Sequence, residues 1–150
     1  MDNPAVERRL EVRFDEREDW GRGLWVSHLY NVTEAADFVA GRGKAKTFDS
    51  ALLVVAVQTP RWGEPRATYD GAQQLPEVAA IMASHKDWSL VAELADGKWT
   101  ASFLAGGTVV GSFTDERAYE AIIRAFDGAI VAAGGAWWGD GRRPGAPTSA

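Results

Sequence analysis

Residues 87–104 read DWSLVAELADGKWTASFL, and this stretch decides the fold. Apolar and polar residues alternate on both sides of the dipeptide Asp96-Gly97, which is the strongest short signal for a tight β-hairpin. The alternation predicts strands over 87–95 and 98–104, with aromatic and aliphatic side chains paired across one face. An antiparallel sheet is therefore the expected centre of the fold.

Further elements are predicted on both sides of this hairpin. Strands are expected over residues 9–14, 24–31, 51–57 and 108–113, and helices over 34–40, over 76–85 and from 115 to Gly134. The order is then β-β-α-β-α-β-β-β-α, with no repeat of any period. This order predicts an α+β fold, a mostly antiparallel sheet of about six strands with two or three helices packed on it.

Two of these predictions rest on short segments. Thr33 is interpreted as the N-cap of the helix over 34–40, and Gly41 and Gly43 as its end. The run ALLVVAV, residues 51–57, has no polar residue and is interpreted as a central strand covered on both faces. Its second face would need another helix or a partner chain, which makes homo-oligomer assembly through this face one hypothesis.

Length and composition limit the class of protein. A chain of 150 residues is expected to form one domain, predicted here over 9–138, with flexible ends at 1–8 and 139–150. The absence of Cys excludes disulfides, thiolate metal sites and a catalytic thiol. No apolar stretch is long enough to span a membrane and no secretory signal is recognised, so a cytoplasmic location is expected. Abundant Ala and Arg with little Lys indicate a bacterial genome rich in G and C.

No familiar catalytic or cofactor motif is found. GRGKAK, residues 41–46, lacks the first Gly and the hydroxyl residue of a phosphate-binding loop, and is interpreted as the basic end of a helix. The acidic loop from Asp15 lacks the ligands of a calcium loop. His28 and His85, the two histidines, have neither metal-ligand spacing nor a nucleophile beside them. The sequence therefore predicts no catalytic residue, no metal site and no cofactor.

Tryptophan is the unusual signal. Trp25, Trp88 and Trp99 fall on predicted strands and are expected in the core. Trp20, Trp62, Trp137 and Trp138 fall in loops or past the last helix, beside Asp, Arg and Gly. These four either form a binding surface or cover sheet edges and helix ends. The predicted binding residues are Trp20, Trp62, Tyr69, Asp70, Trp137, Trp138 and Arg142.

The first functional hypothesis is a non-catalytic protein-binding module, possessing an acidic surface that bears tryptophan. A net charge of -5 suits a basic partner such as a nuclease, so an inhibitor or immunity-type role is inferred. The alternative is a small-molecule-binding protein or small enzyme with a pocket between the sheet and the loop 59–74, lined by Trp62, Tyr69, Asp70 and His28. Nucleic acid is not an expected partner, because the net charge is negative and the cations are dispersed.

Overall fold

The computed structural model describes residues 6–33, 35–56 and 75–134. Its strands are β1 (Val6–Asp15), β2 (Leu24–Val32), β3 (Asp37–Ala45), β4 (Trp88–Ala95), β5 (Lys98–Ala105) and β6 (Thr108–Asp115). Its α-helices are α1 (Phe48–Ala56), α3 (Leu75–Met82) and α4 (Ala118–Ala132), and one short 3-10 turn, η1 (Asp19–Gly21), lies between β1 and β2.

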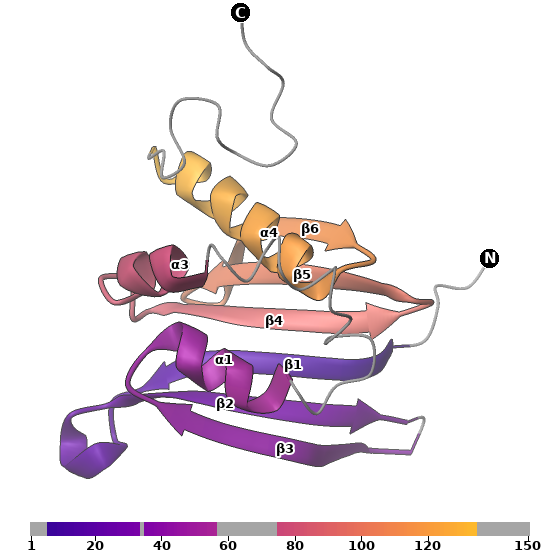
Figure 1. Ribbon diagram of the computed structural model, residues 1–150, viewed down its shortest axis with the longest axis horizontal. Coiled ribbons are helices and arrows are strands. Elements are labelled where there is room, and N and C mark those ends of the chain that lie inside the picture. The colour runs from indigo at the N-terminus through magenta and orange to yellow at the C-terminus, as the bar shows by residue number, and fades with distance from the viewer. Residues whose placement is uncertain (1–5, 34, 57–74, 135–150) are drawn as a thin grey trace, which may run out of the picture.

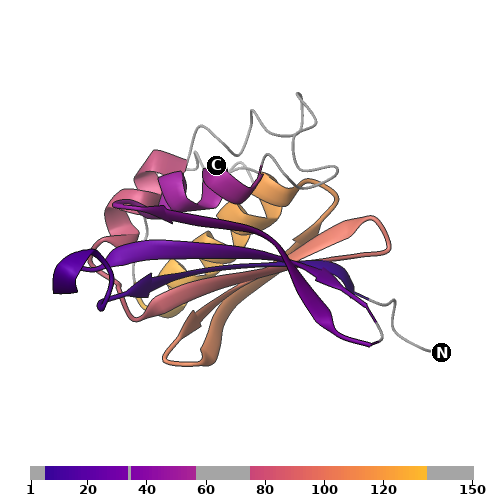
Figure 2. The same cartoon turned by 90° about the horizontal axis from the view of Figure 1, so that it is seen from below.

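The six strands form one antiparallel sheet with the order β3-β2-β1-β4-β5-β6. The three helices all lie on the same face of this sheet (Figures 1 and 2). The structure therefore confirms the predicted α+β class, a sheet of six strands with three helices. The hairpin of β4 and β5 also forms as predicted, and its turn residues Asp96 and Gly97 have φ values of 51° and 74°. Two consecutive positive φ values are typical of the type I′ turn that Asp-Gly favours.

The architecture consists of two similar halves that the sequence does not reveal. The segment β1-β2-β3-α1 and the segment β4-β5-β6-α4 have the same element order, and they meet where β1 pairs with β4. Trp25 in β2 and Trp99 in β5 occupy equivalent positions in the register. Their cross-strand partners are Phe14 and Ala45 for Trp25, and Leu94 and Asp115 for Trp99. At two of these three equivalent positions the residues differ, Phe14 against Leu94 and Ala45 against Asp115.

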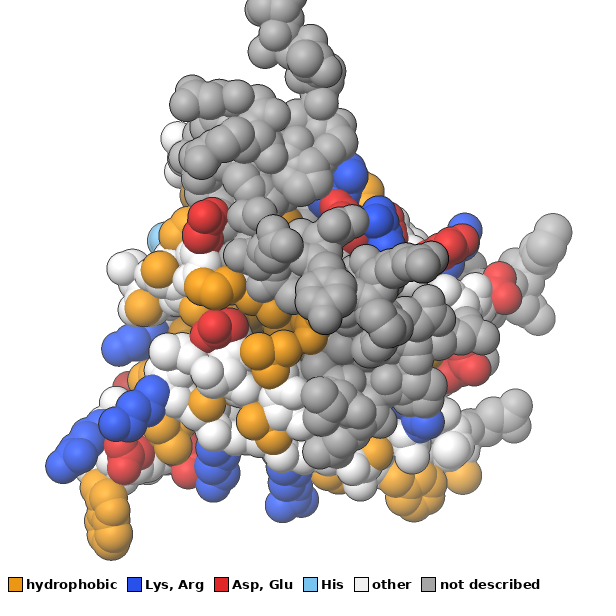
Figure 3. All heavy atoms as spheres, viewed as in Figure 1, with side chains coloured by type: hydrophobic (Ala, Val, Ile, Leu, Met, Phe, Trp, Pro, Cys, Tyr) orange, Lys and Arg blue, Asp and Glu red, His pale blue; other side chains and the backbone are white. Residues whose placement is uncertain are grey.

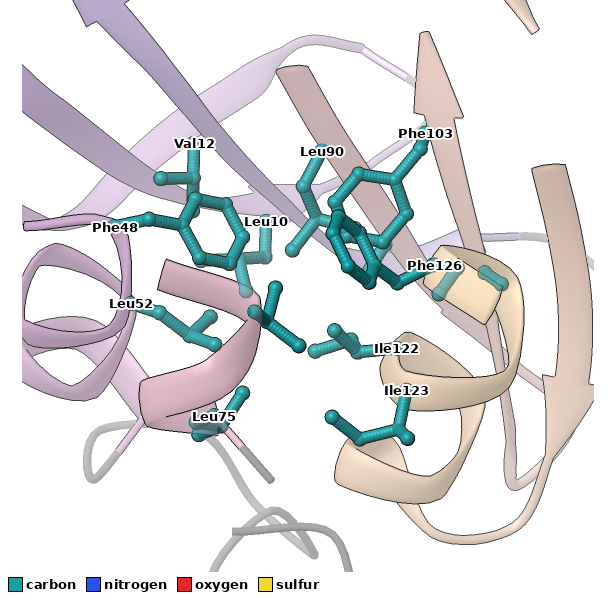
Figure 4. Close-up of a cluster of buried hydrophobic side chains, with 14 of the residues drawn as sticks. Leu10, Val12, Phe48, Leu52, Leu75, Leu90, Phe103, Ile122, Ile123 and Phe126 are labelled. Atoms are coloured by element: carbon teal, nitrogen blue, oxygen red, sulfur yellow. The ribbon is translucent and has the colours of Figure 1, made fainter. Parts of the chain in front are cut away.

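The core lies between the sheet and the three helices. Figure 4 shows side chains of the sheet meeting side chains of the helices, and the labelled residues are Leu10, Val12, Phe48, Leu52, Leu75, Leu90, Phe103, Ile122, Ile123 and Phe126. All ten are buried. The rings of Phe103 and Phe126 pack edge to face, with centroids 5.2 Å apart, and join β5 to α4. Trp25, Trp88 and Trp99 are buried in this core, as predicted.

The prediction of a helix over 34–40 is wrong, because the chain from Asp37 onward belongs to strand β3. Thr33 does not cap a helix; its hydroxyl donates to the carbonyl of Ala36 at 2.6 Å and accepts the Ala36 N–H at 3.1 Å. The side chain therefore closes the connection between β2 and β3. Gly41 and Gly43 lie within the strand rather than at a helix end, so the interpretation of GRGKAK as a basic helix end is also wrong.

The prediction of a strand over 51–57 is also wrong, because the residues of this stretch that the structure describes belong to helix α1. The helix begins at Phe48, and its buried residues recur at helical spacing: Phe48, Ala51, Leu52 and Val55. Leu53 and Val54 are apolar but exposed, and they hid this periodicity in the sequence. The observed order is therefore β-β-β-α-α-β-β-β-α, and the hypothesis of assembly through a central strand loses its basis.

Candidate functional site

The connection between β1 and β2, residues 16–23, is an ordered loop closed by its own hydrogen bonds. The N–H groups of Gly21 and Gly23 donate to the carbonyl of Glu18 at 3.2 and 2.8 Å, and that of Arg22 donates to Asp19 at 3.1 Å. At the base of the loop, the carboxylate of Asp15 accepts the N–H of Arg17 at 3.0 Å. This backbone hydrogen bond, helped by the charges of neighbouring arginines, lowers the pKa of Asp15.

Trp20 lies at the tip of this loop and is 96% exposed, more than any other large apolar side chain that the structure describes. Asp19 and Trp20 both have left-handed backbone conformations, with φ values of 51° and 57°. For any residue that has a Cβ, this conformation costs about 1 kcal/mol in free energy. It persists only where surrounding contacts impose it. The loop therefore presents an unburied indole on a backbone that is held in a strained shape.

A hollow of about 350 Å³ adjoins the loop. Its charged lining residues are Arg22 from the loop, Lys46 from the link between β3 and α1, Lys86 from the link between α3 and β4, and Asp19. Three positive charges thus meet one negative charge at this end of the molecule. Figure 3 shows several Lys and Arg side chains gathered where the β1–β2 loop lies in Figure 1.

Aromatic side chains line the hollow beneath these charges. The rings of Phe14 and Trp25 pack edge to face with centroids 5.4 Å apart, and Trp25 packs in the same way on Phe48 of α1. The ammonium nitrogen of Lys86 lies 4.8 Å from the centroid of the Phe14 ring, within the range of a cation–π contact. The hollow therefore combines an apolar wall continuous with the core and a cationic rim.

A salt bridge attaches the loop to the sheet. The ammonium of Lys44 on β3 lies 2.9 Å from the carboxylate of Glu18. Such an exposed pair contributes little to stability. However, the carbonyl of Glu18 is also the acceptor for Gly21 and Gly23, so the pair restrains the residue about which the loop closes.

His28 lies on the face of the sheet opposite the helices and not at this hollow. Its neighbours across the strands are Glu11 on β1 and Arg42 on β3, and its ring stacks on that of Tyr30 with centroids 6.0 Å apart. Partial burial is the largest cause that lowers the pKa of His28, and the positive charges of nearby arginines add to the effect. His28 is therefore held towards its neutral form.

Of the predicted binding residues, the structure describes Trp20 and places it on the surface. Trp62, Tyr69, Asp70, Trp137, Trp138 and Arg142 lie outside the described residues, as does the loop 59–74. Arg22, Lys46 and Lys86 were not predicted from the sequence as a group. No spacing in the sequence relates these three positions, because the sheet and three separate connections bring them together.

Comparison with protein-family models, with curated protein sequences and with solved structures finds no match. Among the described residues, no three side chains of the kinds that ligate metals form a group able to hold a metal ion. Within the same residues, no helix has the length and apolar character needed to cross a membrane.

Proposed function

We propose that this protein is a non-catalytic module that binds another protein, with Trp20 as the anchor of the contact. The observation that carries the proposal is the 96% exposure of the Trp20 side chain on a loop closed by its own hydrogen bonds. Tryptophan is enriched among the residues that contribute most to binding at protein interfaces. A preformed loop also loses less conformational entropy on binding.

The two halves of the sheet support a dedicated role for this loop. In the second half, the equivalent hairpin of β4 and β5 is joined by Asp96 and Gly97 alone. In the first half, the chain uses residues 16–23 for the same connection. Two residues suffice to join such strands. The additional residues are the ones that carry Trp20 outward, and binding residues are disproportionately found on such loops.

The inferred role is that of an inhibitor or immunity-type protein in the cytoplasm of a bacterium. The net charge of -5 favours a partner that is basic overall, because opposite charges accelerate encounter and disfavour other partners. This long-range attraction is independent of the local contacts that Trp20 makes.

A pull-down from lysate of the source cells tests the proposal, with tagged wild-type protein beside Trp20→Ala and Phe38→Ala. Phe38 is a matched control because it is an aromatic residue, 56% exposed, that pairs with Asn31 at the opposite end of β2. We expect one stoichiometric partner with the wild type and with Phe38→Ala, and its loss with Trp20→Ala. All three proteins should melt at similar temperatures. Retention of the partner by Trp20→Ala would contradict the proposal.

A further inference from the structure

We propose that the hollow beside Trp20 is a carboxylate-binding subsite that takes one Asp or Glu side chain of the bound partner. The inference rests on the proposed function and specifies its chemistry. The hollow shares Asp19 and Arg22 with the η1 turn and its flank, so a protein docked on Trp20 also covers the hollow. Three cations and one carboxylate line it, which leaves an excess of positive charge to be matched.

The pairing of the surrounding charges supports this assignment. Other basic side chains of the loop and its flanks have carboxylate partners: Arg13 and Arg17 with Asp15, and Lys44 with Glu18. Within the described part of the chain, no carboxylate forms an ion pair with Arg22, Lys46 or Lys86. All three cations that line the hollow therefore lack a carboxylate partner among the described residues, unlike Arg13, Arg17 and Lys44 beside them.

The second half of the fold provides an internal comparison. A more open hollow of about 660 Å³ lies at the equivalent place, beside the β4–β5 turn and the link between β6 and α4. It is lined by Lys98, Thr114, Asp115, Glu116 and Arg117. There Arg117 pairs with Asp115 at 3.2 Å and lies 3.7 Å from Glu120. The charges of that hollow balance within the chain, whereas those of the hollow beside Trp20 do not.

Size and lining favour a single acidic side chain. A volume of about 350 Å³ is at the lower end of the range for ligand pockets, roughly 300 to 1,000 Å³. Phe14 and Trp25 offer an apolar wall for the aliphatic part of Glu or Asp. The planar guanidinium of Arg22 can donate hydrogen bonds to both carboxylate oxygens. Lys46 and Lys86 add positive charge without a fixed hydrogen-bond geometry.

NMR titration of the 15N-labelled protein tests the subsite with three probes. The first is glutamate with its α-amino and α-carboxyl groups capped as amides, the second is glutamine capped in the same way, and the third is inorganic phosphate. We expect capped glutamate to shift the amide signals of Gly23, Lys46 and Lys86 in a saturable manner, with an affinity that falls as salt is added. Capped glutamine, which lacks the charge, should leave these signals unmoved.

Variants assign the effect to the hollow. The double variant Lys46→Gln with Lys86→Gln should lower the affinity for capped glutamate by about tenfold or more, because two of the three charge-assisted contacts are removed. Lys98→Gln, at the equivalent hollow of the second half, should leave the affinity unchanged. Absence of saturable shifts with capped glutamate would overturn the assignment. Tighter binding of phosphate than of capped glutamate at the same amides would also overturn it, in favour of a site for phosphate.

The outcome is separable from that of the pull-down. Trp20→Ala should bind capped glutamate as the wild type does, because Trp20 does not line the hollow. If Trp20→Ala loses the partner in the pull-down but capped glutamate does not bind to the wild type, only the proposal of a carboxylate-binding subsite is wrong. If Trp20→Ala retains the partner, the proposed function is wrong whatever the titration shows.

Discussion

The ring of Phe14 lies directly over the backbone of Gly23, so closely that a Cβ at position 23 would overlap the ring. Gly23 also has a φ of +88°, a conformation that other residues rarely adopt. The contact places Phe14 between Gly23 and Trp25, with Lys86 over its ring. A glycine at the end of the loop therefore shapes the wall of the hollow.

Gly23→Ala is expected to destabilise the protein more than Gly21→Ala. Both glycines have nearly the same φ, +88° and +87°, but a Cβ at Gly21 would meet nothing within 4 Å. Gly21→Ala therefore costs only the backbone strain, of order 1 kcal/mol. Gly23→Ala adds the displacement of Phe14, roughly 1–3 kcal/mol more. Urea denaturation measures both, and equal losses would show that the Phe14 contact contributes nothing.

Gly111→Ala and Gly128→Ala should change stability in opposite directions. A Cβ at Gly111, on β6, would collide with the backbone of α4 at Ala125 and Ala129. Backbone cannot yield as a flexible side chain does, so we expect a loss of about 1–3 kcal/mol. A Cβ at Gly128, within α4, would meet only the Cα of Gly111 at 3.9 Å. Alanine there should stabilise the helix by about 0.5–1 kcal/mol. Thermal unfolding should therefore give a lower melting temperature for Gly111→Ala and a higher one for Gly128→Ala than for the wild type.

The hairpin of β4 and β5 could be predicted from the sequence because every local signal agreed. Strict alternation, an Asp-Gly turn and paired aromatic residues specify the same structure. Around residues 33–57 the signals conflicted. Thr33 can cap a helix or close a turn, and a short apolar run is compatible with a strand or with a buried helix. In the structure α1 packs on β3, and Gly43 lets the helix approach so closely that a Cβ at position 43 would overlap Val54. Tertiary packing of this kind overrides local preferences.

The candidate site could be predicted only in part. Trp20 stood out because the residue type, the neighbouring Gly and the loop position agreed. The hollow could not be predicted, because Arg22, Lys46 and Lys86 come from three connections. Their meeting depends on the order of the strands, which local patterns in the sequence do not reveal.

Ser27→Ala is expected to cost about 1–3 kcal/mol, because a buried hydrogen bond is lost. The Ser27 side chain on β2 is fully buried, and its hydroxyl donates to the carbonyl of Ala51 in α1 at 2.7 Å. Ser102→Ala is the matched control, since the Ser102 hydroxyl lies 3.2 Å from that of Ser112 on the exposed face. We expect that control to change the free energy of unfolding by less than about 0.5 kcal/mol. Similar losses for both variants in urea denaturation would contradict a role for the buried bond.

The lowered pKa of His28 predicts a loss of stability on acidification. The unfolded chain takes up a proton near the ordinary value of 6.5, whereas folded His28 does so only at lower pH. Above pH 6.5 both states are neutral and the native state keeps its full stability. As the pH falls from 6.5 through the folded pKa, the unfolded state binds the proton first and the free energy of unfolding decreases. His28→Gln should lack this component of the pH dependence.

The effect of nearby charges on the pKa of His28 can be separated from the effect of burial. Arg13, Arg42 and Lys44 lower this pKa, and Glu11 raises it. Proton NMR of the imidazole should give a midpoint below 6.5 in the wild type, and Arg42→Gln should raise that midpoint because a facing positive charge is removed. Burial would still lower the pKa in the variant, so its midpoint should stay below that of an exposed histidine. A wild-type midpoint at or above 6.5 would show that neither the partial burial nor the arginines disfavour the charged ring.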